Sequence, residues 1–348
     1  MKVSVTETNR QLQTLPVDPE LIPGARNAVN VCLRVQPAEK VTVITDEATK
    51  EIAAALVREL EIVGAAFNAW ILEDLAPRPL NELPAEVADD METSQVSIFA
   101  VQAQKNELKS RMQMTDIVNR RKMRHAHMVN INRQIMLEGM RADFLKVDRI
   151  SAKVIDLVTR AKAIRARTAA GTDLTATLNP NYRWLKTSGI ISPEKWGNLP
   201  GGECFTTPGE VNGTFVIDGV VGDYLCAKFG DLKENPLTIQ VKGNRLIEAH
   251  SDNRELEEDF WRYTHTDENS DRVGEFAIGT NIELKDVIGQ ILQDEKYPGV
   301  HIAFGNPYGA HTGADWYSST HIDVVGRKFD IWVDSQQIMR NGQFLLEA

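Results

Sequence analysis

The sequence predicts an α/β amino-terminal domain with a mainly parallel sheet, followed by an α+β domain that is rich in strands. Two observations support this prediction. Short apolar, β-branched runs alternate with helical periods as far as about residue 144. From Ala163 onward, glycine-containing turns separate short strand-like runs. We therefore expect one domain over residues 1–162 and a second over residues 163–348.

Four apolar runs in the first half are predicted strands, namely residues 41–46, 66–72, 96–101 and 125–132. Helical periodicity follows the first of these runs over residues 47–62 and the last over residues 133–144. Strands that are joined by helices are typical of a parallel sheet, because the helix carries the chain back to the starting edge. No strand is followed by GxGxxG or GxxxxGK[ST], so we expect no nucleotide cofactor.

In the second half, predicted strands cover residues 214–221, 237–241 and 330–333. Turn sequences such as Leu199-Pro-Gly-Gly202 separate short segments, a pattern typical of antiparallel sheets. Cys204 follows Glu203 in such a segment, so the two side chains should lie on opposite faces of a strand. We interpret Cys204 as a core residue.

Composition excludes several classes of function. There are 39 Lys and Arg residues against 49 Asp and Glu residues, a net charge of −10, which argues against nucleic acid as a partner. No run approaches the about 18 apolar residues that span a membrane. The first 23 residues do not resemble a secretion signal. Three cysteines without CxxC spacing make disulfides and thiolate zinc sites unexpected, so we expect a cytoplasmic protein.

Five of the seven histidines lie in the last hundred residues, and two of them suggest metal chemistry. His321 and Asp323 are two residues apart, so a strand would place both on one face. An imidazole beside a carboxylate can bind a divalent cation, but the same pair also occurs as a hydrogen bond on a surface strand. His301 opens the apolar run HIAF and is also compatible with a buried histidine that bonds a backbone carbonyl.

Two glutamates add to this pattern. Glu275 precedes an apolar run, where a carboxylate must be solvated, paired or bound to metal. Glu203 lies in a Gly-Gly-Glu turn. The segments GGECFTTP (201–208), GEFAIGTN (274–281), EK followed by HIAFG (295–305) and HID (321–323) resemble, in order and setting, the aminopeptidase T family of metallo-aminopeptidases. The seven-residue offset from His301 to Tyr308 also fits that family.

The resemblance implies a set of ligands for two divalent metal ions, Zn, Co or Mn: Glu203, Glu275, His301, Tyr308, His321 and Asp323. It also implies a homodimer. The expected activity is hydrolysis of an amide or N-terminal peptide bond of a small substrate by water that two metals activate. The three carboxylates would carry a charge of −3, against +4 from two divalent ions. The general base is unassigned, and Glu295 is one possibility.

Two alternatives remain from the sequence. The related 2,5-dihydroxypyridine dioxygenases use one Fe(II) with two histidines and a carboxylate to cleave a hydroxylated aromatic ring. We expect such an enzyme to place a histidine where this chain has Glu275, and His265 is the nearest substitute. A binding protein without catalysis is the third interpretation, and the complete ligand set argues against it. The expected partner is a peptide or small molecule, with neither nucleic acid nor membrane.

Overall fold

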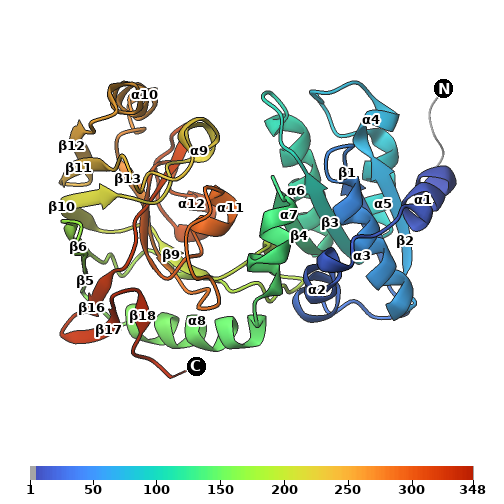
Figure 1. The fold of residues 1–348 in the computed structure, drawn as a ribbon, viewed down its shortest axis with the longest axis horizontal. Coiled ribbons are helices and arrows are strands. Elements are labelled where there is room, and N and C mark those ends of the chain that lie inside the picture. Colours follow the sequence, from blue (N-terminus) through green and yellow to red (C-terminus); the bar gives the residue numbers. More distant parts are fainter. Residues whose placement is uncertain (1–4, 348) are drawn as a thin grey trace. The chain divides into compact units, whose positions relative to one another are not determined.

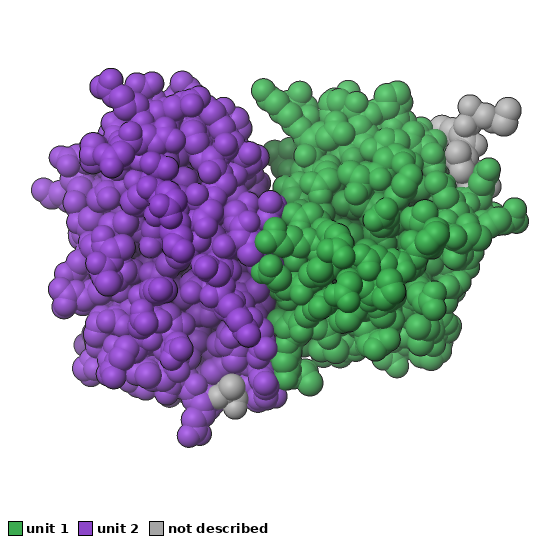
Figure 2. Space-filling model, viewed as in Figure 1, with its two compact units in different colours: residues 1–145, 189–201 green, residues 146–188, 202–348 purple. Residues whose placement is uncertain are grey.

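The computed structural model describes residues 5–347, and the chain forms two compact units (Figures 1 and 2). The first unit comprises residues 1–145 and 189–201, and the second comprises residues 146–188 and 202–348. The boundary expected between residues 162 and 163 therefore falls within the second unit. Helix α8 (Phe144–Val158) precedes that boundary, yet its Ile150, Val154 and Val158 lie in the core of the second unit.

The first unit is built from helices and strands that alternate along the chain. In order they are α1 (Val5–Thr14), η1 (Pro19–Leu21), α2 (Ile22–Arg26), η2 (Asn27–Cys32), β1 (Lys40–Thr45), α3 (Lys50–Val63), β2 (Ala66–Ile71), α4 (Leu72–Leu75), α5 (Ala85–Glu92), β3 (Val96–Val101), α6 (Leu108–Arg121), β4 (Arg124–Val129), α7 (Arg133–Leu137), η3 (Gly139–Arg141) and β8 (Gly197–Asn198).

The five strands form one parallel sheet in the order β2-β1-β3-β4-β8, which confirms the parallel α/β prediction for the first half. Strand β3 is buried along its whole length, as expected for an apolar strand covered on both faces. Helix α3 packs on β1 and β2 and ends at Gly64, whose positive φ of 79° closes the helix.

The single helix expected over residues 133–144 is wrong, because two short segments take its place. Helix α7 ends at Leu137, and a 3-10 turn follows over Gly139–Arg141. The side-chain amide of Asn27 donates hydrogen bonds of 2.9 Å to the carbonyls of Met140 and Ala142. A tertiary contact therefore uses two carbonyls that a continuous helix would need for its own hydrogen bonds. In residues 5–347 no helix is both long and apolar enough to span a membrane.

The second unit is dominated by strands. Its elements are α8 from Lys146 onward, β5 (Ala163–Arg167), β6 (Asp173–Thr177), β7 (Leu185–Thr187), β9 (Glu203–Thr206), β10 (Glu210–Ile217), α9 (Asp223–Phe229), β11 (Leu237–Lys242), β12 (Arg245–His250), α10 (Arg254–Tyr263), β13 (Val273–Gly279), α11 (Ile291–Asp294), β14 (Gly299–Gly305), α12 (Gly309–Thr312), β15 (His321–Val325), β16 (Asp330–Val333), β17 (Gln336–Arg340) and β18 (Gln343–Phe344).

Two antiparallel sheets make up this unit, as the β-rich prediction required. One has the order β12-β11-β10-β6-β5-β16-β17-β18, and the other has the order β15-β14-β13-β9-β7. Apolar side chains from both sheets share one core, which includes Phe215, Phe276 and Phe304. Cys204 belongs to this core and is fully buried, which confirms its interpretation as a core residue. Because side chains alternate along a strand, the residues between these core positions face the other side of the five-stranded sheet.

Candidate metal centre

Five of the six predicted ligands lie on the face of the five-stranded sheet that is turned away from the core. On β13, β14 and β15, Glu275, Ala303 and Asp323 are paired in register across three neighbouring strands. His301 precedes Ala303 by two residues on β14, and His321 precedes Asp323 by two on β15, so all of them share one face. Glu203 begins β9 and pairs with Gly279 of β13. Strand register thus brings together residues that are far apart in sequence.

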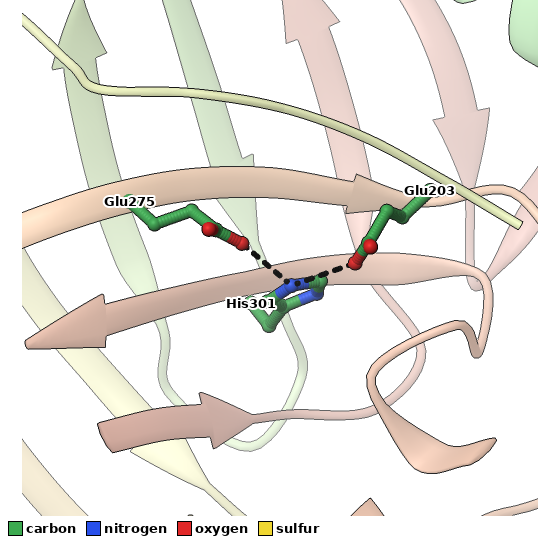
Figure 3. A group of neighbouring side chains, drawn as sticks. All are labelled: Glu203, Glu275 and His301. Carbon is green, nitrogen blue, oxygen red and sulfur yellow. Dashed lines mark ion pairs between the residues drawn. The ribbon is translucent and has the colours of Figure 1, made fainter. Parts of the chain in front are cut away.

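The first group consists of Glu203, Glu275 and His301, with all three residues buried (Figure 3). The imidazole Nε2 of His301 lies 3.4 Å from Glu203 Oε2 and 3.4 Å from Glu275 Oε1. The two carboxylates approach this nitrogen from opposite sides in Figure 3. Each residue offers one ligand atom, and these atoms lie within 4.8 Å of one another.

The second group consists of Glu275, His321 and Asp323, and it meets the same 4.8 Å criterion. Nε2 of His321 lies 3.5 Å from Asp323 Oδ1 and 3.9 Å from Glu275 Oε2. Glu275 therefore belongs to both groups and presents a different oxygen to each. This is the geometry that a carboxylate bridging two neighbouring cations would need.

The donor set fits divalent cations. Ligand atoms about 2.1 Å from one ion are separated from each other by about 3–4 Å, which matches the spacing here. Nε2 of His301 is buried and has no hydrogen-bond partner, although two carboxylate oxygens lie beside it. Nδ1 of His321 donates a 2.9 Å hydrogen bond to the carbonyl of Asn306, which leaves Nε2 to face the acids. A backbone contact of this kind fixes the ring orientation of a ligand histidine.

The pKa values of the cluster show how strongly its charges interact. Burial alone would lower the pKa of His301, but Glu203 and Glu275 outweigh it and raise the pKa to about 10. The pKa of His321 is likewise raised to about 10 against the effect of burial, mainly by Asp323. Burial raises the pKa of Glu275. Both imidazoles therefore hold protons at neutral pH, and a divalent cation would take the place of those protons.

Sequence reasoning missed Lys296 as part of this cluster. Its side chain is 1% exposed, and its ammonium group donates a 2.7 Å hydrogen bond to Glu203 Oε1 and another to Glu295. Thr187 of β7 donates a 2.9 Å hydrogen bond to the same oxygen of Glu203. Burial would raise the pKa of Glu203, but Lys296 and His301 outweigh burial and lower it. The only sequence signal was the pair Glu295-Lys296 ahead of HIAFG.

The remaining candidates lie at different distances from the cluster. The ring centroid of Tyr308 lies 4.5 Å from that of His321, so the tyrosine borders the second group. Tyr308 has a positive φ of 49°, and its amide donates to the side chain of Asn306. His265 belongs to neither group. Its exposed ring stacks on Trp261 and bonds the Trp261 carbonyl, so the structure does not bring it to the other candidates.

Comparison with known proteins decides the family. The family model described as thermophilic metalloprotease (M29) matches residues 142–344, more than half of the chain. The chain belongs to the M29 family of metalloproteases. This confirms the predicted relationship to aminopeptidase T, and it makes the chain a metal-dependent peptidase and a metallohydrolase. No curated protein matches the chain.

Two solved structures share the fold of this M29 chain. The 2,5-dihydroxypyridine dioxygenase from Pseudomonas putida KT2440 is 14% identical, covers 99% of this chain and 99% of its own, and has a TM-score of 0.68. Wild-type AmpT from Thermus thermophilus is 17% identical, covers 94% of this chain and 99% of its own, and has a TM-score of 0.67. At these identities the two structures establish the fold, and they do not choose between the activities that their names describe.

Proposed function

We propose that this M29 chain hydrolyses an amide bond, in particular the N-terminal peptide bond of a small substrate, by means of two divalent metal ions. One observation carries the proposal: Glu275 presents Oε1 to His301 and Oε2 to His321. A carboxylate shared in this way serves two positions at once, whereas a single-metal site needs only one of the two groups.

Each position would be held by residues of this chain. Glu203, Glu275 and His301 would hold one ion; Glu275, His321 and Asp323 would hold the other, with Tyr308 beside it. Two such ions, when bound, lower the pKa of water and polarise a substrate carbonyl. Glu295 contacts Lys296 and belongs to neither group. Burial raises the pKa of Glu295 to about 8, and Lys296 links it to Glu203, so Glu295 is the acid beside the two groups that belongs to neither of them and our candidate for the general base.

Charge balance supports two ions. The four acids Glu203, Glu275, Glu295 and Asp323 and the one ammonium of Lys296 together carry −3 when all are ionised. Two divalent cations would bring this total to +1. A single positive charge in a buried site is well suited to stabilise the negative charge that develops on a carbonyl oxygen under attack.

The dioxygenase alternative is less well supported, even though a dioxygenase shares the fold. A single iron of that type needs two histidines and one carboxylate. Within residues 5–347, no group that could hold a metal contains two histidines. The family match to metalloproteases also favours hydrolysis.

Metal content and substrate turnover test the proposal together. We expect protein purified without oxygen to contain close to two zinc, cobalt or manganese ions per chain by elemental mass spectrometry. It should also release the first residue of dipeptides and tripeptides. One iron per chain, with oxygen uptake on hydroxylated pyridines and no peptide cleavage, would overturn it. The cytoplasmic location and the homodimer stay predictions.

A further inference from the structure

Lys296 brings a permanent positive charge into the metal centre. The residue lies between α11 and β14, and its side chain is 1% exposed. Its ammonium group forms ion pairs with Glu203 and Glu295. A buried lysine that bonds two carboxylates keeps its charge, because the acids compensate the loss of water.

The backbone around Lys296 fixes this position. The Lys296 amide donates a 2.9 Å hydrogen bond to Gln293, and its carbonyl accepts a 3.0 Å hydrogen bond from Asn281. A Cβ atom at Gly279 would lie 2.0 Å from the carbonyl oxygen of Tyr297. The segment thus runs against β13 at a point where only glycine leaves room. The ammonium is therefore held by the fold and not by its two ion pairs alone.

Among the carboxylates of the two groups, Lys296 bonds only that of Glu203, and only its Oε1 atom. Oε1 of Glu203 accepts hydrogen bonds from both Lys296 and Thr187, while Oε2 faces His301. Only Oε2 is therefore directed toward the position where a cation would bind. A ligand that already shares its charge with an ammonium attracts a second cation less strongly.

The other half of the centre has no such cation in the part of the chain that the structure describes. Among the described residues, no lysine or arginine forms an ion pair with Glu275 or Asp323. The ion pairs of these two acids involve only His301 and His321, and both imidazoles would become neutral on binding a metal. The two halves therefore differ in charge although their ligand types are alike.

We propose that Lys296 makes the two metal positions unequal: the position at Glu203 and His301 binds its ion more weakly and fills second, and the position at His321 and Asp323 binds more tightly. This inference rests on the two-metal function proposed above. It also assigns Lys296 as a positioning residue, which acts through Glu203.

Calorimetric titration of the full-length, metal-free protein with Co²⁺ tests the order of binding. We expect two ions per chain with separate dissociation constants. Glu203→Gln should remove the weaker class and retain the tighter one, whereas Asp323→Asn should remove the tighter class. A wild-type chain that binds only one ion would refute the two-metal function itself. Two equal sites, or loss of the tighter class in Glu203→Gln, would refute the inference and leave the function standing.

Lys296→Met tests the cause. Without the ammonium, the dissociation constant of the weaker Co²⁺ site should fall at least about tenfold, so the two dissociation constants should become more similar. Lys186→Met is the matched control, because Lys186 lies on β7, pairs with Asp148 and is 34% exposed. It should leave both constants unchanged. An unchanged gap in Lys296→Met would overturn the role of Lys296. If that variant fails to fold, Lys296→Gln and the Glu203 and Asp323 variants still decide the assignment.

Discussion

Removal of Glu275, the ligand that both groups share, should weaken the binding of both metal ions at once. Thermal unfolding can measure this loss. Glu275 is the only residue common to the two groups of the centre. We expect Glu275→Ala to bind neither ion tightly, while Glu203→Ala and Asp323→Ala should each lose one. A ligand that binds only the folded state at 100 times its dissociation constant stabilises that state by about 2.7 kcal/mol. Two ions, each at that ratio, therefore add about 5 kcal/mol.

The size of the second unit converts this energy into temperature. Its unfolding entropy is about 0.4 kcal/mol/K, from about 190 residues at about 2.1 cal/mol/K each. The wild-type unit should thus melt about 13 °C higher with metal than with chelator, measured by scanning calorimetry. Glu203→Ala and Asp323→Ala, each measured with metal at 100 times the dissociation constant of its remaining site, should show about half of that shift, and Glu275→Ala should show almost none. A Glu275→Ala protein that kept the full shift would refute the shared-ligand geometry.

Three further predictions follow from individual residues. His321→Ala should lose one ion per chain and peptidase activity while circular dichroism stays unchanged, and His265→Ala, whose exposed ring lies outside both groups, should retain both properties. Burial lowers the pKa of His127 to about 3, so below about pH 6.5 the unfolded chain binds a proton that the folded chain excludes. The contribution of His127 to stability should therefore decrease by about 2 kcal/mol as the pH falls from 7 to 5. The difference in unfolding free energy between the wild type and His127→Phe, measured with denaturant, should shift by that amount against the wild type over the same range. Gly279→Ala places a Cβ atom 2.0 Å from the Tyr297 carbonyl oxygen. It should therefore lower both the melting temperature and the affinity for the ion at Glu203 and His301. An unchanged melting temperature and an unchanged affinity would show that the backbone at Lys296 and Tyr297 can move without loss of stability.

The secondary structure was predictable where periodicity alone decides it. The apolar runs at residues 96–101 and 237–241 form β3 and most of β11. Their apolar side chains are buried in the core, as the pattern of apolar residues indicates. The helix over residues 133–144 was wrong for a different reason. Asn27 lies more than a hundred residues earlier in the sequence, and its side-chain amide donates a hydrogen bond to the Met140 carbonyl. A local pattern carries no information about such a contact.

The candidate site was predictable as a set of residue types and not as a geometry. His321 and Asp323 could be placed on one face from their spacing, since alternation in a strand is local. That Glu275 would lie beside both His301 and His321 depended on the strand order β15-β14-β13 and on its register, which no spacing in the sequence specifies. The resemblance to a family supplied the set of residues, and the register of the sheet supplied their arrangement.

Lys296, which the sequence did not predict as part of the site, has a chemical role in the cluster. Four acids in one buried cluster would repel each other and would favour their protonated forms, so the fold needs positive charge there before any metal arrives. Lys296 supplies one charge permanently, and the raised pKa values of His301 and His321, each about 10, supply two more as protons. The two protons can leave when cations bind, but the ammonium cannot. The same side chain that makes the metal-free cluster tolerable would therefore remain as a competitor of one metal ion, and this is the physical origin of the asymmetry that we propose between the two positions.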